Sequence, residues 1–249
     1  MLLKDKVAVV YGAGGSIGGA AARAFAREGA RVFLAGRTAA SLDKLAEGIR
    51  AVGGTAETAV VDAREEAAID AFVDDIAART GRIDISFNAI GYGDVQKPLM
   101  EISEADFLQP IVTAMRSQFL TTRAAARHMI PRGTGVILVF GGGGPQTLPG
   151  LGGFKIALDA LEGLRRQWAI ELGPQGVRIV TLKSGGVPES LPDGFPGRSA
   201  IVDSLVEATQ LGRAATLADV GDVAAFVASD RARTLTATDV NISCGAIVD

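Results

Sequence analysis

Tyr11-Gly-Ala-Gly-Gly-Ser-Ile-Gly18 is a glycine-rich stretch near the start of the 249-residue chain. The apolar run 7–10 precedes it, and an alanine-rich segment, 20–28, follows it. This order predicts a strand, a glycine loop and a helix. Glycine lets the backbone turn tightly and approach a ligand closely, and the start of a helix offers unpaired N–H groups and a positive dipole end. The stretch therefore predicts a loop that binds the pyrophosphate of a dinucleotide.

Strands and helices alternate along the rest of the chain. Apolar runs predict six further strands, and segments with helical periodicity lie between them. This alternation predicts one α/β domain, 1–249, built as a Rossmann-like doubly wound parallel sheet of about seven strands with helices on both faces. Within it, residues 188–210 are expected to form a substrate-side loop and short helix. The expected strands are 7–10, 31–35, 57–61, 84–88, 136–140, 177–182 and 239–242, and the expected helices are 20–28, 39–52, 65–80, 103–129, 155–172, 200–209 and 216–229.

The composition argues against several classes of function. The net charge is −3 at pH 7, so no general attraction to nucleic acid or to an anionic membrane is expected. No apolar run has the length of a membrane span, and the first strand begins too early to leave room for a signal peptide. One cysteine, Cys244, and one histidine, His128, argue against a disulfide and against a metal site. We therefore expect a soluble, cytoplasmic protein that acts on a small molecule.

Motifs along nearly the whole chain resemble those of the short-chain dehydrogenase/reductase family. Asp62 stands where the family has an acid beside the adenine ring, and Asn88-Ala89 is similar to the centre of its Asn-Asn-Ala-Gly motif. Segments 119–125, 160–164, 211–213 and 241–248 are also similar. The resemblance implies a nicotinamide cofactor. The cofactor-binding residues that it implies are Gly12, Gly14, Ser16, Ile17, Gly18, Arg37, Thr38, Asp62, Ala63, Asn88, Ala89, Ile90, Gly185 and Val187.

The residues after the second expected strand predict which cofactor is bound. An acid at this place would bind the free hydroxyls of the adenosine ribose, but Gly36 stands there. The next residue, Arg37, can pair with a ribose 2′-phosphate. We therefore expect NADP(H) to bind better than NAD(H). The alternative is that Arg37 is a solvated surface residue.

The resemblance ends at the residues that carry out the family's chemistry. Family members use a Tyr-x-x-x-Lys pair, in which the tyrosine transfers a proton while the lysine lowers the tyrosine pKa and holds the nicotinamide ribose. A serine and often an asparagine assist them. Alignment of this chain on 160–164 and 119–120 assigns these roles to side chains that cannot transfer or polarise a proton. They are Phe154 for the tyrosine, Leu158 for the lysine, Gly141 for the serine and Ala114 for the asparagine.

Three polar residues are candidates to replace the missing acid–base groups. Neither Tyr11 nor Tyr92 has a lysine four residues further on, but Tyr92 follows the fourth expected strand, near the expected nicotinamide. Lys155 is next to the family's tyrosine position, and Lys183 ends the sixth expected strand. Tyr92 is ranked first because it supplies a phenol. Each candidate has an alternative: a solvated loop for Tyr92, a surface lysine turned about 100° away for Lys155, and a direction away from the cleft for Lys183.

Three functions remain open. The first is an NADP(H)-dependent oxidoreductase with a rebuilt proton donor, which would reduce an activated C=C or C=N bond with a proton from water. The second is a non-redox lyase or isomerase on the same scaffold, and the third is a catalytically inactive cofactor-binding protein. The cofactor loop is better preserved than the acid–base residues, which favours the first.

Two helices predict assembly with further copies of the chain. Segments 118–129 and 156–172 match the helices through which family members form dimers and tetramers. Their faces carry Phe119, Leu120, Leu161, Leu164 and Trp168, more apolar surface than one sheet face needs. We therefore expect a homo-oligomer, a tetramer or a dimer.

Overall fold

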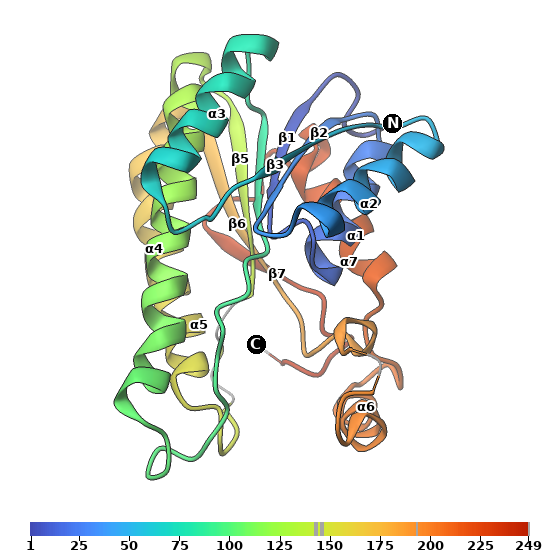
Figure 1. Cartoon of the computed structure of the whole chain (residues 1–249), viewed down its shortest axis with the longest axis vertical. Helices are drawn as coiled ribbons and strands as arrows, with labels where there is room; N and C mark the ends of the chain where they lie inside the picture. Colours follow the sequence, from blue (N-terminus) through green and yellow to red (C-terminus); the bar gives the residue numbers. More distant parts are fainter. Residues whose placement is uncertain (142–143, 145–146, 193, 249) are drawn as a thin grey trace.

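The computed structural model describes residues 1–141, 144, 147–192 and 194–248. In this part of the chain seven strands form one sheet, in the order β3-β2-β1-β4-β5-β6-β7. Every pair of neighbouring strands is parallel. Figure 1 shows the sheet between two layers of helices. The predicted Rossmann-like, doubly wound parallel sheet is confirmed.

The observed elements agree with the predicted ones apart from their ends. The first helix begins inside the glycine-rich stretch, at Ser16 rather than near Ala20, because Gly15 already serves as its N-cap. The strands are β1 Val7–Tyr11, β2 Arg31–Gly36, β3 Thr55–Val60, β4 Ile85–Asn88, β5 Gly135–Phe140, β6 Val177–Lys183 and β7 Thr238–Asn241. The helices are α1 Ser16–Arg27, α2 Ala39–Ala51, α3 Glu66–Thr80, α4 Glu104–Met129, α5 Gly153–Leu172, α6 Arg198–Glu207 and α7 Leu217–Ala228.

The two faces of the sheet build separate parts of the core. On β1, Ala8 and Val10 pack with α1, α2 and α7, whereas Val9 and Tyr11 pack with α3, α4 and α5. Successive side chains of a strand point to opposite faces, so a strand covered on both sides is apolar throughout. Figure 1 shows α3, α4 and α5 on one side of the sheet and α1, α2 and α7 on the other, with α6 apart from both layers.

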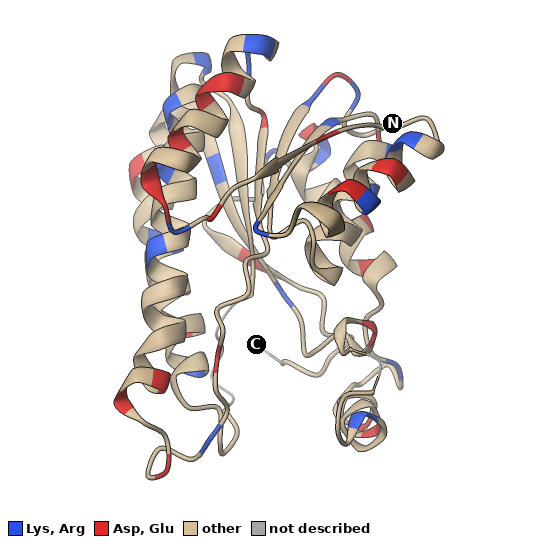
Figure 2. Cartoon of the chain, in the orientation of Figure 1, with Lys and Arg blue, Asp and Glu red and all other residues tan. Residues whose placement is uncertain are grey.

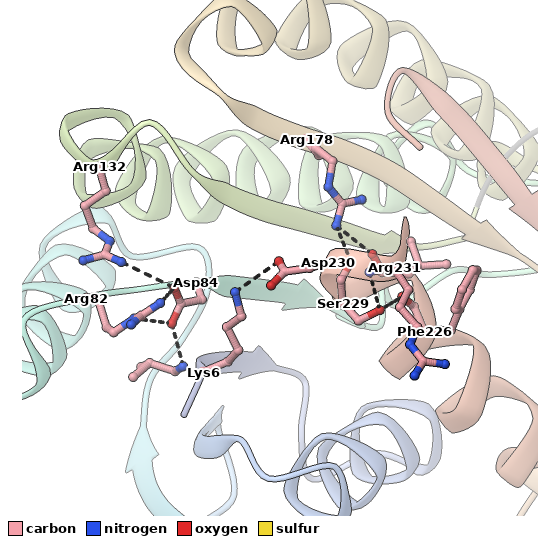
Figure 3. A network of polar contacts seen from close by, with 11 residues as sticks. Lys6, Arg82, Asp84, Arg132, Arg178, Phe226, Ser229, Asp230 and Arg231 are labelled. Carbon is pink, nitrogen blue, oxygen red and sulfur yellow. Dashed lines mark hydrogen bonds and ion pairs between the residues drawn. The ribbon is translucent and has the colours of Figure 1, made fainter. Parts of the chain in front are cut away.

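A buried carboxylate, Asp84, joins several elements at the amino-terminal edge of the sheet, shown in Figure 3. Asp84, which precedes β4, is only 5% exposed. It accepts hydrogen bonds from the Val7 backbone N–H at 2.8 Å and from Arg82 Nε at 2.7 Å, and Arg132 lies 3.8 Å away. This network joins β1, β4 and the turn before β5. The carboxyl edge, where ligands of such sheets bind, is the opposite edge.

Charged residues of both signs are interspersed on the outer helices (Figure 2). Between α3 and α4 they form an ion pair of Arg127 with Asp70 at 3.0 Å, and a hydrogen bond joins His128 Nε2 and Asp74 at 2.7 Å. These contacts hold two neighbouring helices of one layer together. Among the described residues, no helix has the length and apolar character needed to cross a bilayer.

Candidate active site

The glycine loop is packed tightly against the carboxyl ends of β1 and β4. Gly12 has a φ of +72°, and a Cβ there would overlap the backbone oxygen of Ala89. A Cβ at Gly18 would overlap the backbone oxygen of Gly12. Only glycine fits at these two positions. The loop leads into α1, whose N-cap, Gly15, makes no side-chain capping bond, so the first N–H groups of the helix suit an anion.

A cleft of about 310 Å³ lies beside this loop, at the point where the strand order reverses between β1 and β4. Eight of the predicted cofactor residues line it: Gly12, Gly14, Arg37, Thr38, Asp62, Ala63, Ala89 and Ile90. The other predicted residues are not among its lining: Ser16, Ile17, Gly18, Asn88, Gly185 and Val187. The lining also contains residues that the sequence did not indicate, notably Ser41, Arg64, Gln109 and Thr113.

Asp62 is held by Arg64, which is one of the residues not anticipated. Arg64 Nε and Nη2 donate to the Asp62 carboxylate at 3.0 and 2.6 Å. The side-chain hydrogen bonds from Arg64, with a smaller effect of Arg37, lower the pKa of Asp62 to about 2. Asp62 is therefore ionised at neutral pH. Two guanidinium groups meet one carboxylate at this end of the cleft, which leaves a net positive charge for an anionic group.

The four positions that the resemblance assigns to catalysis gather around Tyr92. Ala114 and Tyr92 belong to one buried apolar cluster, against which Phe154 and Leu158 pack. The Phe154 and Tyr92 ring centroids are 6.5 Å apart. A Cβ at Gly141 would lie 3.7 Å from Tyr92 Oη and 3.3 Å from Leu158 Cδ2. The Tyr92 phenol thus occupies the space between α4, the end of β5 and α5.

The two lysine candidates are engaged in ion pairs elsewhere. Lys155 Nζ lies 2.5 Å from an Asp159 carboxylate oxygen one turn further along α5. Lys183 is only 3% exposed, and its Nζ lies 2.6 Å from Asp239 of β7. Of the three catalytic candidates, Tyr92 is the one that lines the cleft. The structure therefore does not bring Tyr92, Lys155 and Lys183 together into one group.

Comparison with known proteins identifies the family. A family model described as enoyl-(acyl carrier protein) reductase matches residues 12–246. A gluconate 5-dehydrogenase of Gluconobacter oxydans (strain 621H) is 33% identical over 226 residues, which cover 89% of this chain and 87% of the relative. The chain belongs to the short-chain dehydrogenase/reductase family. A meso-2,3-butanediol dehydrogenase of Serratia marcescens is 30% identical over 252 residues, covering 99% of this chain and 96% of that protein.

Solved structures of dehydrogenases share the fold. An NAD⁺-bound xylitol dehydrogenase superimposes with a TM-score of 0.88 and 23% identity, over 98% of this chain and 100% of the other. A crystal structure described as a putative short-chain alcohol dehydrogenase from Sinorhizobium meliloti 1021 gives a TM-score of 0.89 with 25% identity, over 98% of this chain and 97% of that one. Its relatives in this family suggest that the protein is an oxidoreductase with a nicotinamide cofactor.

Proposed function

We propose that this protein is an NADP(H)-dependent oxidoreductase whose active site works without the family's Tyr-x-x-x-Lys pair. One observation carries the proposal: the cofactor cleft, with its fitted glycines, borders an apolar cluster at the expected catalytic positions. Among the described residues, this cluster brings no charged side chain to the cleft, which suits hydride transfer to a substrate that needs little acid catalysis. Conjugated C=C and C=N bonds are of this kind.

The residues of the cleft fit a dinucleotide. Gly12 and Gly18 let the loop backbone pack closely at the ends of β1 and β4, and the start of α1 offers N–H groups to the pyrophosphate. Asp62 lies where the adenine ring is expected, and Arg37 and Arg64 supply positive charge for a 2′-phosphate. When bound, the nicotinamide cofactor supplies the hydride chemistry, and the protein supplies position and electrostatics.

The substrate class follows from what surrounds the nicotinamide end. Phe154, Leu158 and Leu161 offer an apolar wall, which excludes water and favours an uncharged substrate. The matching family model is described as an enoyl reductase, and reduction of an enoyl group is reduction of an activated C=C bond. Residues 188–210, which include α6, are proposed as the substrate side of the cleft. The proton would come from water or from Tyr92, with Lys155 and Lys183 as the less favoured donors.

A substrate panel tests this function. The purified protein is mixed with NADPH and with enones, imines or saturated ketones of matched size, and loss of NADPH absorbance is followed. We expect turnover of enones or imines and very slow turnover of the ketones. Robust turnover of simple ketones, or no consumption of NADPH with any member of the panel, would contradict the proposal.

The cofactor preference can be tested at Arg37. A hydrogen bond between charged groups contributes more than a neutral one, so its loss should weaken binding about 10–100-fold. We expect Arg37→Ala to weaken NADP(H) binding by that factor in calorimetry and to change NAD(H) binding little. Arg27→Ala is the control, because Arg27 lies on α1 and pairs with the exposed Asp222. Equal losses for both cofactors, or a wild type that prefers NAD(H), would overturn the NADP(H) preference.

We also propose a homo-oligomer assembled through α4 and α5. Phe119 of α4 is 41% exposed, and its ring stacks on Trp168 of α5 with centroids 5.7 Å apart. Ile156 and Ile170 of α5 are 46% and 75% exposed. These exposed apolar side chains lie on the outer helices, where a second copy of the chain would cover them. Most homo-oligomers are closed, symmetric assemblies, and dimers and tetramers are the commonest.

The assembly can be tested at Trp168. Trp168→Glu is expected to give a lower mass in light scattering at micromolar concentration than the wild type, because burying a carboxylate against Phe119 is costly. Val52→Glu is the control, since Val52 is 84% exposed just after α2, outside the proposed interface. A monomeric wild type would contradict this assignment directly.

A further inference from the structure

Two buried polar side chains meet beside the proposed substrate site. Tyr92 is 5% exposed and Gln118, from the middle of α4, is 1% exposed. Neither the Tyr92 hydroxyl nor either polar atom of the Gln118 amide has a hydrogen-bond partner of normal geometry among the described residues. Leaving such groups unpaired is costly, so a pair kept at the edge of an active site indicates a ligand that completes it.

Tyr92 and Gln118 lie beside the positions that the resemblance assigns to catalysis, where the reacting group of a substrate is expected. Gln118 lies one helical turn after Ala114, the position that the resemblance assigns to asparagine, so both side chains point the same way from α4. The Tyr92 hydroxyl is 3.7 Å from the place that a Cβ at Gly141 would take. Phe154 and Leu158, both half-buried, pack against the cluster that contains Tyr92. Tyr92 itself lines the cleft, so the pair borders the space in which a substrate would react.

Both members of the pair can donate a hydrogen bond at neutral pH. Burial raises the pKa of the Tyr92 phenol, and the approach of the Gln118 side chain opposes that rise only in part. The phenol therefore keeps its proton, and the amide N–H is always a donor. Two neutral donors in an apolar, desolvated place are the arrangement that stabilises an oxygen on which negative charge develops.

We propose that the Tyr92 O–H and the Gln118 N–H bind the carbonyl oxygen of an uncharged α,β-unsaturated carbonyl substrate. This inference rests on the proposed reductase function and specifies its substrate. The bound nicotinamide cofactor would supply a hydride to the β-carbon, and the electron pair of the C=C bond would then move toward the carbonyl oxygen to form an enolate. The enolate oxygen takes the two hydrogen bonds, and a proton from water completes the α-carbon, so that the substrate is reduced and the cofactor oxidised.

Binding of 4-nitrophenolate tests the pair without requiring turnover. A phenolate mimics the enolate oxygen, and its absorbance changes when donors bind it. In the presence of NADP⁺ we expect the wild type to bind this probe, and Tyr92→Phe and Gln118→Leu each to weaken binding about 10–100-fold, as for the loss of a hydrogen bond to a charged group. Gln175→Leu, the same change at an exposed position before β6, should leave binding unchanged.

Enone kinetics separate the roles of the two residues from a general loss of structure. Both variants are expected to lower kcat with enone and to keep the wild-type Kd for NADP(H). The two substitutions are close in shape to the native residues and remove unpaired polar atoms, so thermal stability should be equal or higher. If either variant fails to fold, the other still tests the pair.

The possible results distinguish the pair from the proposed function. If the probe binds through Tyr92 and Gln118 but no enone consumes NADPH, the oxygen-binding site stands and the reductase function is wrong. If enones are reduced and neither variant changes probe binding or kcat, the reductase function stands and the role of the pair is overturned. A wild type that binds the probe no better than the two variants also overturns it.

Discussion

The double substitution Phe154→Tyr with Leu158→Lys is expected to make the protein reduce simple ketones with NADPH about 10²–10⁴ times faster than the wild type, which is the usual contribution of a positioned general acid. Phe154 and Leu158 lie on α5 beside Tyr92, in the cluster next to the cofactor cleft. Restoring the phenol and the ammonium would return a proton donor to a site that we propose still binds the cofactor. Initial rates on saturated ketones at saturating NADPH measure the gain.

Tyr92 and Gly141 limit how much ketone reductase activity the double substitution can restore. Tyr92 Oη and Leu158 Cδ2 both lie within 4 Å of the place that a Cβ at Gly141 would take, so Tyr92→Ala is expected to increase the gain by making room for the new lysine. Gly141→Ser is a poor addition, because Gly141 has a φ of +137°, and a serine there would cost about 1–3 kcal/mol of stability in backbone strain.

Phe154→Tyr with Leu158→Met is the matched control for the restoration. It supplies the phenol and a side chain of similar length to lysine without the charge. The control should gain less than the lysine variant. If the lysine variant binds NADPH but gains no ketone reductase activity, then the assignment of positions 154 and 158 is wrong.

Asp84→Ala is expected to lower the free energy of unfolding by about 1–3 kcal/mol, the cost of leaving a buried polar group without its hydrogen-bond partner. Asp84 is 5% exposed and accepts hydrogen bonds from Arg82 and from the Val7 backbone. Its removal would leave the Val7 N–H without this acceptor and Arg82 without its counter-ion. Urea denaturation measures the loss. A change below 1 kcal/mol would show that water replaces these contacts.

Asp230→Ala is the internal control for Asp84. Asp230 belongs to the same edge of the sheet and pairs with Lys6 at 3.2 Å, but its side chain is 82% exposed (Figure 3). Exposed ion pairs contribute about 0–1 kcal/mol, so this variant should remain close to the wild type. The contrast tests whether burial, rather than the presence of an ion pair, decides the effect.

The fold was predictable because its signals are local. Apolar runs alternate with helical periodicity, and Gly12 and Gly18 stand where the backbone has no room for a Cβ. The limits of the elements were less predictable. Helix α1 begins at Ser16, within a stretch whose composition indicates a loop, because the same glycines that make the turn also allow the first helical turn to form.

The site was predictable only in part because its contacts are not local in the sequence. Arg64 looks like an ordinary surface residue after β3, and its hydrogen bonds to Asp62 depend on the turn that brings the two side chains together. Gln118 reads as one polar residue of a long helix. Its position one turn after Ala114, on the buried stripe of α4, was the available signal.

Each of the two lysine candidates forms an ion pair with an aspartate instead of lining the cleft with Tyr92. The pairing of Lys183 with Asp239 requires β6 and β7 to be adjacent, which the sequence does not state residue by residue. Lys155 pairs with Asp159 four residues further on, which helical spacing does allow to be anticipated. The sequence thus predicted the glycine loop and the cofactor side of the cleft better than it predicted the groups available for catalysis.

Transfer of deuterium from NADPH labelled at C4 of the nicotinamide tests the central claim most directly. The protein is incubated with each C4-labelled epimer of NADPH and an α,β-unsaturated ketone, and the product is examined by mass spectrometry and NMR. We expect a saturated ketone that carries one deuterium at the β-carbon from one of the two epimers. A protein that binds NADPH but transfers no deuterium to this or any other substrate of the panel would contradict it.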